Sequence, residues 1–168
     1  LLLQERMPRD VALARPPPEQ TTEPVESDSL VPEAQRRYTS AHSRVPRTQL
    51  LSNGRYSVMV TAAGSGYSRW RDVAVTRWRE DATRDDRGSY VFLRDVRSGG
   101  VWSAGFQPIG TEPTSYHVSF NEDRAEITRQ DGALTTTLEV LVSAEDDAEV
   151  RRVSITNAGD RERDIDVT

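Results

Sequence analysis

The chain has 168 residues and a net charge of −5, contains no cysteine, and all 22 of its cationic residues are arginine. The absence of cysteine excludes disulfides, thiolate chemistry and cysteine-ligated zinc, and the absence of lysine excludes Schiff-base catalysis and a lysine-dependent phosphate loop. No apolar run approaches the ~20 residues of a transmembrane helix, and no basic stripe indicates nucleic-acid binding.

The first 48 residues predict no packed domain. Residues 1–14 are typical of the tail of a preceding segment, with a short helix that Pro8 breaks. Residues 15–48 contain repeated prolines and few large apolar side chains, so they bury too little apolar surface to offset the entropy of ordering them. We interpret them as an extended Pro-rich linker. Because the chain begins with Leu1 and not Met, we interpret it as a piece of a longer protein.

From residue 49 to 168 the sequence predicts an all-β lobe, truncated near its C-terminal end. Apolar and polar residues alternate with a period of two along several short runs, and Asp131-Gly132 predicts a hairpin turn. No helical period competes after residue 50. The spacing of the runs is typical of an antiparallel β-sandwich. The expected strands are 55–60, 73–78, 90–93, 101–103, 116–120, 125–130, 134–142, 150–155 and 165–167.

Acid–base and metal chemistry have few candidate residues. The only histidines are His42, in the expected linker, and His117, which the alternation predicts on the solvent face of a strand. The acidic clusters at 80–81, 85–86, 122–123 and 145–147 are interpreted as solvated turn residues, and none is selected as a glycosidic acid or a calcium loop. We therefore predict no catalytic residue and no metal site.

Gly64-Ser65-Gly66 is interpreted as a turn between strands. No Gly-Lys-Ser/Thr follows it, as a phosphate loop would require. The alternative is a close approach of the backbone to a ligand or a neighbouring lobe, which glycine permits.

Aromatic and arginine residues interleave in one stretch, and this stretch holds the candidate binding residues. Aromatic faces can stack on sugar rings, and arginine can hydrogen-bond to sugar hydroxyl groups. Two alternatives remain open: each tryptophan packs in the core beneath arginine stems, or the stretch contacts another lobe. The candidates for substrate binding or a lobe interface are Tyr67, Arg69, Trp70, Arg71, Trp78 and Arg79.

A series of motifs then carries a family resemblance. In their order along the chain, they resemble the opening of the glycoside hydrolase family 94 module, formerly glycosyltransferase 36, of cyclic β-1,2-glucan synthases. Residues 1–10 resemble the segment that leads into that module, and residues 62–66 read Ala-Ala-Gly-Ser-Gly where the family usually has Asn-Ala-Gly-Gly-Gly. The motifs are residues 51–61, 64–72, 75–81, 101–108, 123–126 and 151–157.

The resemblance implies an antiparallel β-supersandwich, galactose-mutarotase-like, that precedes an (α/α)6 barrel. In the family the barrel carries the catalytic Asp and the phosphate-binding groups, so no catalytic residue transfers to this chain, and we expect the chain alone to be inactive. The lobe is shared with cellobiose, cellodextrin and chitobiose phosphorylases. The implied partners are a β-glucan or glucooligosaccharide, the missing barrel and a second copy in a homodimer.

The implied parent reaction is carbohydrate phosphorolysis or β-1,2-glucan processing with inversion at the anomeric carbon, with inorganic phosphate and no other cofactor. The expected location is cytoplasmic, including the soluble part of an inner-membrane synthase. Two alternatives remain: a free-standing carbohydrate-binding β-sandwich module, and a structural or adhesive sandwich with a protein partner.

Overall fold

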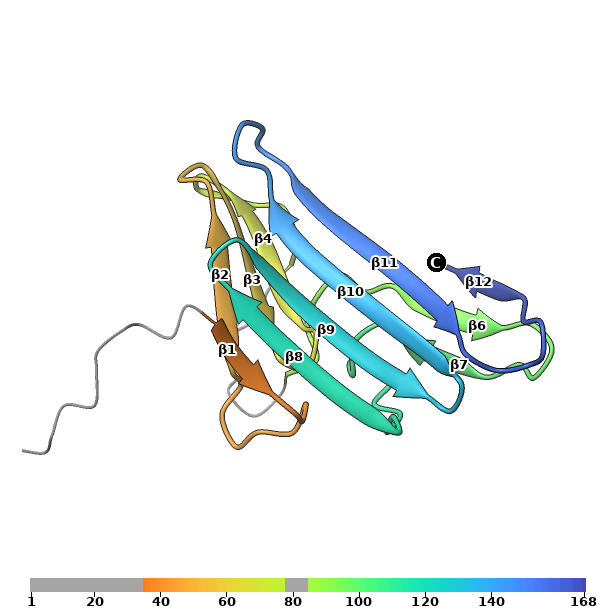
Figure 1. Cartoon of the computed structure of the whole chain (residues 1–168). Helices are drawn as coiled ribbons and strands as arrows, with labels where there is room; N and C mark the ends of the chain where they lie inside the picture. The colour runs from red at the N-terminus through yellow and green to blue at the C-terminus, as the bar shows by residue number, and fades with distance from the viewer. Residues whose placement is uncertain (1–34, 78–84) are drawn as a thin grey trace, which may run out of the picture. The chain divides into compact units, whose positions relative to one another are not determined.

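The computed structural model describes residues 35–77 and 85–168, and in this part of the chain every regular element is a β-strand (Figure 1). The predicted all-β class is confirmed. The short helix expected within residues 1–14 and the linker up to residue 34 lie outside the described residues. The strands are β1 Gln35–Tyr38, β2 Thr48–Ser52, β3 Tyr56–Thr61, β4 Gly66–Trp70, β5 Val73–Ala74, β6 Phe92–Asp95, β7 Val101–Ser103, β8 Ser115–Asn121, β9 Arg124–Asp131, β10 Leu134–Val142, β11 Glu149–Asn157 and β12 Ile165–Val167.

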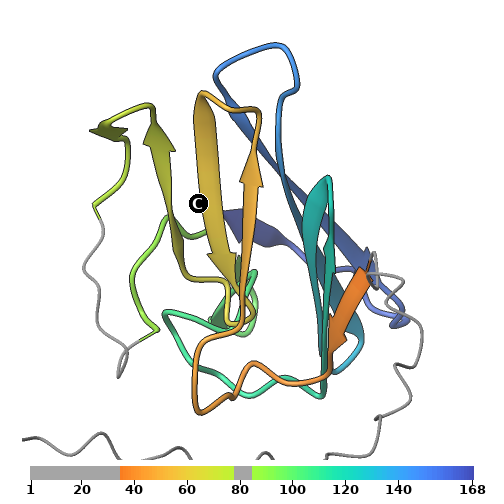
Figure 2. The same cartoon turned by 90° about the vertical axis from the view of Figure 1, so that its left-hand side faces the viewer.

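The strands form three antiparallel sheets. A five-stranded sheet has the order β1-β8-β9-β10-β11, a four-stranded sheet the order β2-β3-β4-β5, and a three-stranded sheet the order β12-β6-β7. In Figure 1 the two smaller sheets lie behind opposite ends of the large one, and Figure 2 shows the four-stranded sheet facing it. This is a sandwich in which one long sheet is shared by two short ones.

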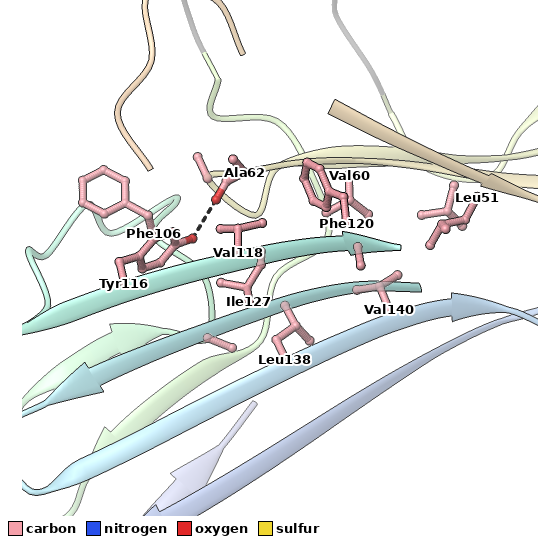
Figure 3. Close-up of a cluster of buried hydrophobic side chains, with 14 of the residues drawn as sticks. Leu51, Val60, Ala62, Phe106, Tyr116, Val118, Phe120, Ile127, Leu138 and Val140 are labelled. Carbon is pink, nitrogen blue, oxygen red and sulfur yellow. Dashed lines mark hydrogen bonds between the residues drawn. The ribbon is translucent and has the colours of Figure 1, made fainter. Parts of the chain in front are cut away.

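The core lies between the sheets and follows the strand alternation. Val58 and Val60 from β3 are buried, as are Val118 from β8 and Ile127 from β9. Figure 3 shows Val60, Val118 and Ile127 in this cluster. Since successive side chains of a strand point to opposite faces, the residues between them face outward. His117 is accordingly exposed on β8, as the alternation predicted.

Two sequence predictions differ from the structure, and β2 and β4 are strands that the sequence analysis did not predict. The linker predicted for 15–48 is wrong over Gln35–Tyr38, because these residues pair with the edge strand β8 and Tyr38 packs edge-to-face on Phe120 at 5.6 Å. A short strand can add to an existing sheet edge without any apolar pattern of its own. Within the described residues, the strand expected from Val73 to Trp78 is reduced to Val73–Ala74, both exposed, so no buried face sustains it.

One buried charge connects β9 to the segment that follows β7. The side chain of Arg129 is 0% exposed, and its Nε and Nη2 atoms each donate to the Asp131 carboxylate at 2.7 Å. The remaining N–H groups donate to backbone carbonyls of Ser103 at 3.1 Å, Gly105 at 2.7 Å and Thr111 at 3.2 Å. All five guanidinium donors are thus satisfied, which compensates for the cost of burying the charge.

Removing this cation should destabilise the lobe far more than removing an exposed one. Arg129→Met leaves Asp131 without its partner and three carbonyls unpaired, so the free energy of unfolding in urea should fall by about 3 kcal/mol or more. The control is Arg97→Met, because the Arg97–Asp164 pair has side chains 61% and 58% exposed, and its loss should cost less than about 1 kcal/mol. Equal losses for the two variants would contradict the role given to Arg129.

Candidate functional site

The candidate binding residues lie on a ribbon formed by β4 and β5. We call residues 66–76 the β4–β5 ribbon; it carries Tyr67, Arg69, Trp70 and Arg71. Arg69 pairs with Ala74 and Trp70 with Val73. The turn between the strands has two residues, 71 and 72. Its first residue, Arg71, has φ +49°, a positive value of the kind that two-residue hairpin turns use at this position. Trp78 and Arg79 lie outside the described residues.

The candidate residues do not share one face. Ser68 and Trp70 point toward the five-stranded sheet, since each bonds to a residue near the start of β11 or in the loop before it. Alternation along the strand places Tyr67 and Arg69 on the opposite, outward face. The structure therefore separates the predicted set into an inner tryptophan and an outer tyrosine and arginine.

Trp70 forms part of a polar contact between the sheets. Its indole Nε1 donates to Asp147 Oδ2 at 2.6 Å, and Arg55 Nε donates to Asp147 Oδ1 at 2.7 Å. The Arg71 guanidinium carbon lies 5.0 Å from the centre of the Trp70 ring. The hydrogen bond from Trp70, followed by that from Arg55, holds the pKa of Asp147 below its ordinary value. Trp70 is 37% exposed, so it neither lies in the core nor offers an open platform.

Other contacts fix the same loop, residues 143–148, between β10 and β11. Asn53 Nδ2 donates to the carbonyls of Ser143 and Asp146, each at 2.9 Å, and Arg55 Nη2 donates to the carbonyl of Glu145 at 2.9 Å. Sequence reasoning missed these partners because they lie about 90 residues further along the chain, and no local pattern connects them.

The outward face of the ribbon contains a surface hollow of about 600 Å³. Its lining includes Met59, Tyr67, Arg69 and Asp72. Leu50, Met59 and Tyr67 are cross-strand neighbours and form an apolar row, while Arg69 and Asp72 approach within 3.8 Å at the rim. An apolar floor beside a cation and a carboxylate can hold a ring with one apolar face and several hydroxyl groups.

The turn at Gly64-Ser65-Gly66 joins β3 to β4, so the turn interpretation is confirmed. A Cβ on Gly66 would lie 1.9 Å from the Met59 carbonyl oxygen, and one on Gly64 would lie 3.2 Å from the Cα atom of Gly105. The close backbone approaches seen here are to the chain's own neighbouring segments.

Within residues 35–77 and 85–168, no three His, Asp or Glu side chains are grouped so that they could hold a metal ion. The same residues include no helix with the length and apolarity needed to cross a membrane.

Residues 33–168 match the family described as "Glycosyl hydrolase 94, supersandwich domain". The chain belongs to this family. Its fold agrees with that name, and the family resemblance found in the motifs is confirmed.

Relatives in the family are much longer than this chain. The chain is 42% identical over 170 aligned residues to the cyclic beta-(1,2)-glucan synthase NdvB of Rhizobium meliloti (strain 1021), covering 100% of this chain and 6% of that protein. It is 27% identical to the N,N'-diacetylchitobiose phosphorylase of Vibrio furnissii, over 71% of this chain and 16% of that protein. It is 29% identical to the 3-O-beta-D-glucopyranosyl-beta-D-glucuronide phosphorylase of Paenibacillus borealis, over 77% and 16% respectively.

The contact between Trp70 and Asp147 should respond to acid with a defined sign. Because the folded-state pKa of Asp147 is lowered from 3.8, its stabilisation is present above that value and is lost as the pH falls through the lowered pKa. Tryptophan emission of the native chain should therefore change at a pH below 3.8 while circular dichroism still shows intact sheets. Asp147→Asn should abolish this step, and Trp70→Phe identifies the emitting residue. An unchanged acid step in Asp147→Asn would contradict the assignment.

Proposed function

We propose that the chain is a non-catalytic lobe of a larger β-glucan phosphorylase or cyclic β-1,2-glucan synthase, where it braces an (α/α)6 barrel and contacts the glucan. The observation that carries this proposal is the 42% identity to NdvB along 100% of the chain. The match to the supersandwich family and the similarity to two phosphorylases agree with it.

The use of carboxylates in the described part of the chain also favours a non-catalytic role. Phosphorolysis needs a positioned acid that can donate its proton near neutral pH. Here Asp95 is paired with Arg163, Asp131 with Arg129, and the buried Glu139 with Arg152. Cation partners favour the ionised form of a carboxyl group, which is the wrong form for a proton donor. We infer that the catalytic acid and the site for inorganic phosphate belong to the barrel.

The hollow beside Tyr67 and Arg69 is the proposed contact for a β-1,2-glucooligosaccharide. The Tyr67 ring offers an apolar face, and Arg69 and Asp72 offer a donor and an acceptor for hydroxyl groups at the rim.

We further propose that the lobe works in the cytoplasm, as part of a membrane-associated synthase outside the bilayer, and that a second copy can meet it in a homodimer.

The second candidate function is a free-standing carbohydrate-binding module, and the same hollow favours it. Both functions allow weak sugar binding by the chain alone, so they differ in what the barrel adds. An affinity that is the same with and without the barrel favours the module, whereas an affinity that the barrel strengthens favours the bracing lobe.

The chain alone should not catalyse phosphorolysis. Incubation with inorganic phosphate and β-1,2-glucooligosaccharides should release no glucose 1-phosphate above a protein-free blank, because we infer that the catalytic acid and the phosphate site belong to the barrel. A complete family 94 phosphorylase with its own substrate serves as the positive control. Release of glucose 1-phosphate in proportion to the chain's concentration would overturn the non-catalytic assignment.

Sugar binding at the ribbon should depend on its outward face. In calorimetric titrations with β-1,2-glucooligosaccharides, Tyr67→Ala should weaken binding about tenfold, or about 1.4 kcal/mol. Trp70→Phe is the matched aromatic control and should leave the affinity within about twofold, because Trp70 faces the other sheet. A larger loss for Trp70→Phe than for Tyr67→Ala would place the sugar elsewhere.

A further inference from the structure

A second hollow, of about 410 Å³, lies near the opposite end of β4 from Trp70. It is lined by the loop between β1 and β2, by Ala63 of the turn that precedes β4, by Asp85, and by Phe106 and Gln107 after β7. None of the candidate residues from the sequence lines this hollow, and no residue of the β4–β5 ribbon lines it.

Backbone hydrogen bonds hold the walls of this hollow. The amide groups of Phe106 and Gln107 both donate to the carbonyl of Ala63, at 3.0 and 2.9 Å, and the amide of Ala62 donates to the carbonyl of Arg47 at 2.8 Å. Three segments distant in sequence therefore meet in a fixed arrangement. A preformed cavity reduces the entropy that a ligand must overcome on binding.

Asp85 is the unusual group in this cavity. Its Oδ1 atom is buried and has no hydrogen-bond partner, and no described arginine or histidine pairs with the carboxylate. Burial raises the pKa of Asp85, against the lowering effect of the Thr61 and Ser65 hydroxyl groups, and Asp86 raises it further. A half-buried carboxyl group without a cation is costly, and such groups occur preferentially where a ligand completes their hydrogen bonding.

The other lining residues supply an aromatic wall and complementary polar groups. The rings of His42 and Phe106 meet edge-to-face at 4.8 Å, and His42 Nε2 is held by Glu112 Oε1 at 2.6 Å. Arg44 lines the hollow, and its guanidinium has no hydrogen-bond or ion-pair partner among the described residues. Gln107 adds an amide that can donate and accept.

The charge balance identifies the class of ligand. One carboxyl group and one guanidinium group leave the cavity close to neutral, so it favours neither an anion nor a cation. A pyranose ring suits these groups, because its C–H face can pack on an aromatic ring, its hydroxyl groups can donate to a carboxylate, and its oxygens can accept from a guanidinium group.

We propose that this hollow binds one pyranose ring of a neutral glycan, as a second sugar site distinct from the ribbon. The inference rests on the proposed function, because it assumes that the lobe meets a glycan, but it can fail while that function stands. Two sites near the two ends of one strand would let the lobe hold separate residues of one glucan.

The test is a titration of the ¹⁵N-labelled 168-residue chain with methyl β-D-glucopyranoside and with sophorose. We expect saturable shifts of the amide signals of Gly64, Ser65 and Gln107, with a dissociation constant in the millimolar range. Asp85→Asn should weaken binding at these amides about tenfold, since a charged hydrogen-bond acceptor is lost at nearly constant volume. The matched control is Asp86→Asn, because Asp86 is exposed and does not line the hollow; it should bind like the native chain.

A second variant, Arg44→Gln in the exposed loop, should weaken binding severalfold. It keeps the inference testable if thermal unfolding shows that Asp85→Asn is not folded. Shifts confined to the ribbon and abolished by Tyr67→Ala would overturn the second site and leave the proposed function intact. Absence of any sugar-dependent shift from the isolated chain would overturn the second site. The proposed function would stand, because a lobe that braces the barrel can contact sugar only when the barrel is present. Inorganic phosphate shifting the same amides more strongly in Asp85→Asn would show an anion site and overturn the inference.

Discussion

The Arg129 guanidinium is a positive charge buried between sheets, and the arrangement around it depends on its five hydrogen bonds. Two of them go to Asp131 on the same strand, and three go to carbonyls between Ser103 and Thr111. If any of these acceptors moved away, a buried donor would lose its partner, at a cost of about 1–3 kcal/mol out of the roughly 5–15 kcal/mol of net stability of a typical domain. The irregular segment after β7 is therefore held against β9 although it has no regular structure of its own.

That segment in turn positions the end of the four-stranded sheet. Phe106 and Gln107 bond to the Ala63 carbonyl, and Tyr116 Oη donates to the Ala62 carbonyl at 2.8 Å (Figure 3). Strand β4 is thus held at both ends. The turn that precedes it is fixed by these bonds, and Trp70 at its far end is held by Asp147. Both hollows border this strand or its preceding turn, so the network around Arg129 and the contact at Asp147 together determine their shapes.

The distribution of charge in the described residues favours the proposed supporting role. Several of the described arginines neutralise carboxylates, from the buried pair at Asp131 to the pair of Asp95 with Arg163. Asp85 departs from this pattern because burial raises its pKa while no described cation compensates it. In a family whose named relatives process glycans, an uncompensated acceptor beside an aromatic wall is suited to sugar hydroxyl groups.

The sequence by itself determined the all-β class, the family and the buried face of the long strands, because a period of two and the order of the motifs are local properties that a chain carries before it folds. It also indicated that Gly64-Ser65-Gly66 is a turn. Only the tertiary structure decided that Gln35–Tyr38 is a strand, that Trp70 and Tyr67 face opposite ways with different partners, and that Asp85 lines a cavity. Those outcomes depend on contacts between residues tens of positions apart, whose pairing is set by which sheet edges and buried charges meet, and no local pattern encodes such a meeting.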